Sequence, residues 1–162
     1  MTARPECGAN RVADALVLAL KKISAVEDAG QWLTTPRAVT RGFFVDDLQA
    51  PRPAFYVAVA GLRNKPETVP AAHEGTIVLE VTGLSEAPAN QPAAEAELNR
   101  LMSDAIRAVS LDEYLADADG VKTVLFAQAL SYEPNVEIMR GTGLGAATLI
   151  VEASFRWTHG TP

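Results

Sequence analysis

Cysteine is almost absent from this sequence, which has one, Cys7, among 162 residues. A single cysteine cannot form a disulfide within the chain, so a reducing cytoplasm is the expected compartment. The sequence also lacks an apolar run near the roughly 20 residues that a membrane span requires. Its first residues, MTARPECGANR, lack the apolar core of a signal peptide. These absences predict a protein without membrane association that is made and kept inside a cell.

Positive charge is scarce as well, with 14 Lys and Arg against 20 Asp and Glu and a formal net charge of −6. A protein that grips nucleic acid neutralises phosphates with Lys and Arg, and no basic run is present to do so. The acids concentrate in residues 91–119, where Arg100 and Arg107 are the only bases. A solvated helix surface is the ordinary interpretation. The alternatives are an acidic surface for a basic partner, or one that lets DNA pass without binding it.

The residue types that most often carry catalysis are also few. His73 lies in a predicted loop and His159 among the last four residues, so neither is placed as a base held by a third group. A zinc site takes three or four His, Cys or carboxylate ligands, which two distant histidines and Cys7 do not supply. We therefore predict no catalytic, cofactor-binding or metal-binding residue and no enzymatic activity.

Two short motifs resemble ligand-binding loops without meeting their requirements. The glycine-rich run at 141–145 precedes a predicted strand, whereas a phosphate-binding loop precedes a helix, so a flexible hairpin loop is predicted. Either of the acidic pairs at 46–47 and 117–119 could bind a cation, but both are interpreted as solvated turns, and the second is too short for a calcium-binding EF-hand loop.

Hydrophobic periodicity predicts a single domain of two helices and five strands. The helices are expected at about 10–23 and 91–109. The strands are expected at 37–45, 54–61, 75–84, 121–132 and 146–157. This order, α-β-β-β-α-β-β, predicts an α+β fold with a mainly antiparallel sheet and both helices packed on one face. Residues 1–9 and 159–162 are expected to be tails outside the domain 10–158.

Alternation along the strands separates a buried face from an outward one. The strand at 146–157 alternates most clearly, and the rule directs Glu80, Glu152 and Arg156 away from the core. On the second helix, Glu97, Arg100 and Asp104 are expected on the solvent side, at spacings that allow them to pair with one another. The outward strand charges either face solvent or form a surface between subunits, where charge sets partner choice. Trp32, Phe43 and Phe44 fit an interface or a core equally well.

Two connections are long for hairpins, namely 62–75 and 132–145, and long loops on a rigid sheet commonly carry function. Together with the outward strand charges they give the candidate interface residues. These are Arg63, Lys65, Glu67, Glu80, Glu137, Arg140, Glu152 and Arg156.

The order of the segments resembles the tail terminator, or tail completion, proteins of tailed bacteriophages. The resemblance covers about 10–158 and depends on architecture more than on a signature motif. The segments that carry it are RVADALVLALKKI, VTR, PAFYVAV, TIVLEVTG, AEAELNRLMSDAIRAV and TLIVEASFRW.

The resemblance implies a non-enzymatic structural protein of the virion, located where tail meets neck. The family forms a hexameric ring that caps the tail tube, ends its polymerisation and joins it to a neck or head-completion protein. DNA passes through the lumen of such a ring without specific binding. Two other interpretations stay open: another head–tail connector or neck protein, and a small ligand-binding or enzymatic α+β domain. An oligomeric scaffold unrelated to phage is a further alternative.

Overall fold

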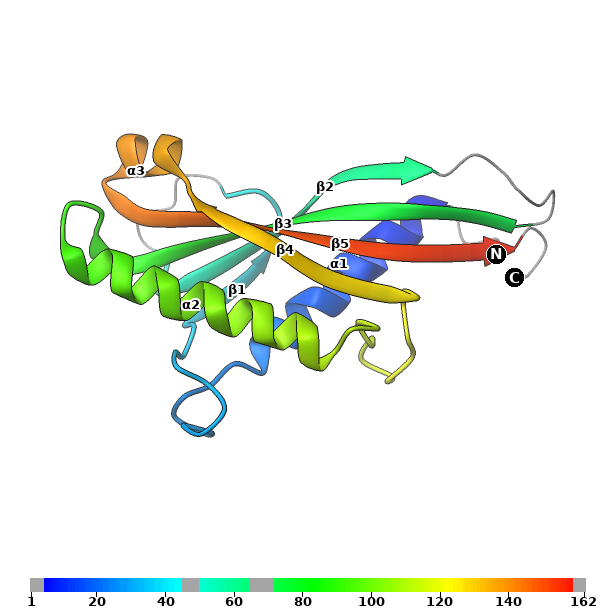
Figure 1. Ribbon diagram of the computed structural model, residues 1–162, viewed down its shortest axis with the longest axis horizontal. Helices are drawn as coiled ribbons and strands as arrows, with labels where there is room; N and C mark the ends of the chain where they lie inside the picture. Colours follow the sequence, from blue (N-terminus) through cyan, green and yellow to red (C-terminus); the bar gives the residue numbers. More distant parts are fainter. Residues whose placement is uncertain (1–4, 45–49, 65–71, 159–162) are drawn as a thin grey trace.

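The computed structural model describes residues 5–44, 50–64 and 72–158. Its elements follow one another in the order α-β-β-β-α-β-α-β (Figure 1). In chain order they are α1 (Pro5–Lys21), β1 (Ala38–Arg41), β2 (Ala54–Asn64), β3 (Ala72–Pro88), α2 (Pro92–Leu111), β4 (Phe126–Pro134), α3 (Val136–Thr142) and β5 (Leu144–Thr158). The α+β class and the five strands agree with the sequence prediction.

The five strands form one mixed sheet in the order β1-β2-β3-β5-β4. Every neighbouring pair is antiparallel except β1 and β2, which run parallel, with Ala38 opposite Ala54. The prediction of an antiparallel sheet is therefore wrong at this edge. A parallel pair requires the chain to return to the end where the first strand began. Twelve residues connect Arg41 to Ala54. No local sequence pattern in this connection predicts a parallel pairing.

The core lies between one face of the sheet and the helices α1 and α2. Leu16 and Leu20 of α1 and Leu101 of α2 are fully buried against the inward side chains of β2, β3 and β5. The helix α1 begins at Pro5, five residues before the predicted start at about 10, so residues 5–9, predicted as part of a tail, are helical. Trp32 enters the same core from the connection after α1, which resolves its role in favour of packing.

A third helix, α3, occupies half of the segment predicted as a hairpin loop at 132–145. The side chain of Asn135 caps it by accepting a hydrogen bond from the Ile138 amide, 3.1 Å away. Gly143 ends it with a φ of +72°, a conformation that glycine adopts without steric cost. Ile138 packs into a second, smaller cluster around Tyr56 on the sheet face opposite α1 and α2. The glycine-rich run is thus a helix end, followed by a strand as predicted.

The central strands are longer than predicted. β2 continues to Asn64 and β3 begins at Ala72, so the expected loop at 62–75 is shorter than the sequence suggested. Figure 1 shows β3 and β5 running well past the end of α2. Gly75 permits the contact between them, since a Cβ there would lie 2.6 Å from the Arg63 carbonyl oxygen and 2.5 Å from the Phe155 ring.

Candidate assembly surface

The sheet has one covered face and one largely open face. Leu79 of β3 lies opposite Val151 of β5, and both are fully buried beneath the helices. In each strand, the residues on either side of these two point to the opposite face of the sheet, because successive side chains of a strand alternate. One end of that other face is covered by Phe44 and α3. We call the remainder the open face; the residues at its centre are Val78, Glu80, Gln128, Ser131, Ile150 and Glu152.

Glu80 and Glu152 are neighbours at the centre of the open face. Glu80 lies opposite Ile150, and Glu152 lies opposite Val78 on one side and Gln128 on the other. This register makes the two carboxylates diagonal neighbours on adjacent strands. Both are half-buried, and among the described residues neither forms an ion pair. The outward direction predicted for both is what the structure shows.

The other candidate residues do not gather there. Arg63 is exposed near the end of β2, opposite Thr76, on the same side of the sheet but two rows from Glu80. Glu137 and Arg140 are exposed on α3, where an acid in the first turn and a base in the last suit the helix dipole. Lys65 and Glu67 lie outside the described residues, as does the side chain of Arg156. The candidates are therefore not one cluster.

Most acids of segment 91–119 hold the protomer together instead of facing solvent. Asp104, expected on the solvent side of α2, is only 2% exposed. It accepts hydrogen bonds from the amides of Leu33 and Thr34 at 2.9 and 2.7 Å and from the Thr34 hydroxyl at 2.6 Å. Its prediction is wrong because the connection after α1 folds over α2, a contact that helical periodicity does not contain.

Glu97 and Asp117 are engaged in a similar way. Glu97 accepts from the amides of Glu86 and Ala87 at 2.9 and 3.2 Å. Asp117 pairs with Arg11 of α1, and this hydrogen-bonded pair, helped by the Val121 amide, holds the pKa of Asp117 below its ordinary value. Three of the acids of segment 91–119, namely Glu97, Asp104 and Asp117, are therefore engaged within the protomer, and the segment does not form one acidic surface.

With these acids engaged, the outer side of α2 is basic along most of its length. Arg100 and Arg107 are exposed, and neither forms an ion pair with a described residue. Among the described acids of α2 only Glu95, in its first turn, is both exposed and unpaired. The seven-residue spacing of the two arginines is a sequence signal for this, because it places them on one side of a helix.

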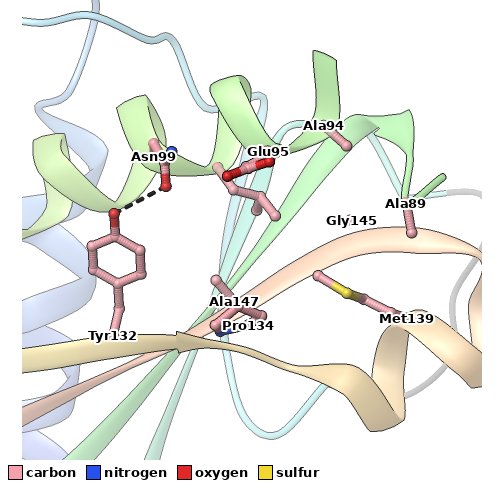
Figure 2. A pocket seen from close by; sticks show the side chains of 10 residues that line it. Ala89, Ala94, Glu95, Asn99, Tyr132, Pro134, Met139, Gly145 and Ala147 are labelled. Carbon is pink, nitrogen blue, oxygen red and sulfur yellow. Dashed lines mark hydrogen bonds between the residues drawn. The ribbon is translucent and has the colours of Figure 1, made fainter. Parts of the chain in front are cut away.

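A small cleft of about 270 Å³ lies between α2, β4 and α3. Figure 2 shows Met139 and Ala147 at its base and the Tyr132 hydroxyl donating to the Asn99 side-chain oxygen at its mouth, a bond of 3.0 Å. Glu95 is the one carboxylate of its lining. Apolar walls with few polar groups suit an apolar side chain or small apolar group. The sequence did not predict this cleft, because α3 was not predicted.

Two further features bear on the classes of function. No three His, Cys, Asp or Glu side chains within the described ranges are grouped as a metal site would require. No helix in those ranges has both the length and the apolar character needed to cross a membrane.

Comparison with known proteins finds likeness only among solved structures. No protein-family model matches the sequence, and no curated protein matches it significantly. Among solved structures, the chain is similar to the sheath/tube terminator of an extracellular contractile injection system, PVC, in its extended state. The alignment has 10% sequence identity and a TM-score of 0.41 and covers 99% of this chain. The chain spans 60% of the length of that terminator chain.

Proposed function

We propose that this chain is a tail terminator of a tailed bacteriophage. Copies of it form a ring, with six subunits expected, that caps the tail tube, ends its polymerisation and joins it to a neck or head-completion protein. The proposed role is structural and belongs to the virion, at the tail–neck junction. It assigns no catalytic residue and no cofactor to the chain.

The observation that carries this proposal is the open face. The helices α1 and α2 cover one side of the five-stranded sheet, and α3 and Phe44 cover only one end of the other, which leaves the rest of that side for a partner. That remaining surface combines aliphatic Val78 and Ile150 with two carboxylates. Carboxylates on a mostly apolar surface favour partners of matching charge and disfavour others. Such a surface is typical of a subunit in an assembly.

The edge strand β4 gives independent support. No strand of the sheet lies beside its outer edge, because β4 is last in the order, although its Ala127 amide donates to the Glu113 carbonyl oxygen. Leu125 and Phe126 are 55% and 44% exposed at its start, and Leu130 is 49% exposed within it. Monomeric proteins protect edge strands with charge or short length, so an edge nine residues long with exposed apolar groups favours association.

The decisive experiment is native mass spectrometry of the full chain across a concentration series. A second sample contains tail tubes assembled from the tube protein encoded in the same gene cluster, with electron microscopy of the tube ends. A closed ring, alone or on tube ends, is the expected result. A chain that stays monomeric and ignores the tubes would contradict the proposal.

A neck protein of another kind is the main alternative and shares the same surroundings. Binding to the tube end, and not to isolated portal rings, distinguishes the terminator from such a connector. A ligand-binding domain would instead show a large saturable rise in melting temperature with a metal or nucleotide, since ligands of the native state raise stability. The cleft between α2 and α3 is where a small apolar ligand would then be sought.

A further inference from the structure

The open face and the outer side of α2 have opposite charge. The central rows of the open face carry Glu80 and Glu152, with Glu133 of β4 at the margin and no cation among their described side chains. On the other side of the protomer, Arg100 and Arg107 are exposed on α2. Each surface thus presents two charges without a described ionic partner, and the signs are complementary.

The outer side of α2 also has a shape that a sheet can approach. Ala96, Ser103 and Ser110 recur every seven residues beside the two arginines, so small side chains follow one side of the helix. The hydroxyls of Ser103 and Ser110 turn back to carbonyl oxygens of their own helix, at 2.7 and 3.0 Å. The arginines lie about 10 Å apart along the axis, from the rise of 1.5 Å per residue.

We infer that the open face around Glu80 and Glu152 binds the outer side of α2, around Arg100 and Arg107, of a second copy of this chain. This inference depends on the proposed ring and names its subunit contact. Because helices α1 and α2 cover the opposite side of the sheet, the two surfaces face away from each other on one protomer. A contact between two different surfaces is heterologous, and it closes into a ring when its rotation divides a full turn.

The contact combines apolar burial with charge selection. Val78 and Ile150 supply apolar surface beside the carboxylates, and the small residues of α2 allow close approach to it. The charges select the helix of a neighbour over a second open face, because two open faces would bring four carboxylates together. The contact is therefore directed from sheet to helix and not face to face.

The test uses two charge-reversal variants. The sheet variant carries Glu80→Arg and Glu152→Arg, which leaves both surfaces basic; the helix variant carries Arg100→Glu and Arg107→Glu, which leaves both acidic. Each variant alone is expected to lose assembly, with the apparent dissociation constant raised at least about tenfold. An equimolar mixture is expected to recover it, because an alternating order restores every contact.

Native mass spectrometry reads the outcome directly, since the two variants differ in mass. Assemblies of even subunit number and one-to-one composition are the expected product of the mixture. Two control variants change net charge equally outside both surfaces, at exposed residues that are not candidate interface residues: Glu27→Arg with Asp119→Arg, and Lys21→Glu with Lys122→Glu. The controls are expected to assemble like the unmodified chain. Circular dichroism confirms that each variant folds, and Glu80→Gln with Glu152→Gln replaces the sheet variant if it does not.

Two outcomes overturn the inference and separate it from the proposed function. If the unmodified chain forms rings and both reversal variants do so equally well, the ring stands and this contact is wrong. The contact is also wrong if each variant is monomeric and the mixture stays monomeric. If the unmodified chain forms no ring, alone or on tubes, the proposed function fails together with the contact.

Discussion

Asp104 is a buried residue whose single side chain joins two distant parts of the chain. Its carboxylate lies on α2 and holds Leu33 and Thr34, about 70 residues earlier, through two amides and a hydroxyl. The same connection carries Trp32 into the core. The position of the connection, and with it the entry to β1, therefore depends on one buried acid.

Replacing Asp104 is expected to destabilise the protein strongly. Asp104→Ala leaves two backbone amides without their acceptor, and we expect a loss of about 2–3 kcal/mol in the free energy of unfolding. Asp104→Asn keeps one acceptor oxygen and is expected to lose about half as much. Urea denaturation measures both. The control is Ser103→Ala, at the exposed neighbouring position, which should change stability by less than about 0.5 kcal/mol.

Asp117 predicts how stability depends on acid pH. Its pairing with Arg11 lowers the pKa of Asp117 in the folded protein below that in the unfolded chain. A carboxyl whose pKa is lowered by folding adds stability at pH values above its pKa in the unfolded chain, which is about 4. This contribution disappears as the pH falls through the pKa of Asp117 in the folded protein. Asp117→Asn is expected to be less stable than the unmodified chain at neutral pH and to converge with it in acid. Thermal melts between about pH 2 and pH 7 measure the difference.

Asp119 supplies the control for this prediction. It is exposed in the same turn. Its backbone amide, and not its carboxylate, forms a hydrogen bond with Asp117, donating to the carboxylate of that residue. Asp119→Asn should leave the pH profile unchanged. Parallel profiles for the Asp117→Asn variant and the unmodified chain would show that the Arg11 pair contributes no pH dependence.

The long strands β2, β3 and β5 depend on one glycine where they extend past α2. A Cβ at Gly75 would approach the Arg63 carbonyl oxygen, which belongs to backbone and cannot move aside as a flexible side chain can. Gly75→Ala is therefore expected to cost about 1–3 kcal/mol by overpacking, measured by urea denaturation. Gly61→Ala in β2 is the control, because no atom lies within 4 Å of its Cβ position. Equal stability of the two variants would contradict the predicted clash.

Long periodic elements could be predicted from the sequence, whereas short and non-local ones could not. The helix at 91–109 and the strand at 146–157 match α2 and β5 closely, because each repeats its pattern over many residues. The helix α3 has seven residues, too few for a periodic signal, and depends on the Asn135 cap and on packing. The parallel pairing of β1 with β2 depends on tertiary structure, and the four residues of β1 do not determine it.

The candidate surface was predicted in part for the same reason. Alternation places Glu80 and Glu152 outward, and pairing register alone makes them neighbours, since β3 and β5 are about 70 residues apart. The basic side of α2 was hidden in a segment of net negative charge. Only the folded arrangement shows that Asp104 and Glu97 face the protomer's own backbone and leave Arg100 and Arg107 exposed.

At the scale of the whole molecule, the sequence has an excess of acidic residues and a net charge of −6, but the fold places unpaired acidic and basic side chains on different surfaces. The acids that remain free on the sheet and the bases that remain free on α2 lie on opposite sides of one small protomer. A subunit with this polarity favours head-to-tail association over symmetric pairing, because a two-fold contact would place like charges against each other. Head-to-tail association of this kind closes into a ring when the rotation at each contact divides a full turn.

The same polarity predicts how the assembly responds to salt. Exposed charges are screened over about 10 Å at 0.1 M ionic strength and over about 3 Å at 1 M, so an interface selected by carboxylate–arginine pairs should weaken as NaCl rises. We expect sedimentation velocity to show dissociation between about 50 mM and 500 mM NaCl. The variant with Glu80→Gln and Glu152→Gln should assemble more weakly at low salt but lose most of this dependence, because its sheet no longer carries the charges. A contact formed mainly by the apolar edge of β4 would behave oppositely and strengthen in sulfate, since excluded salts favour apolar burial. Salt dependence therefore distinguishes the open face from the β4 edge as the surface that holds neighbouring subunits together.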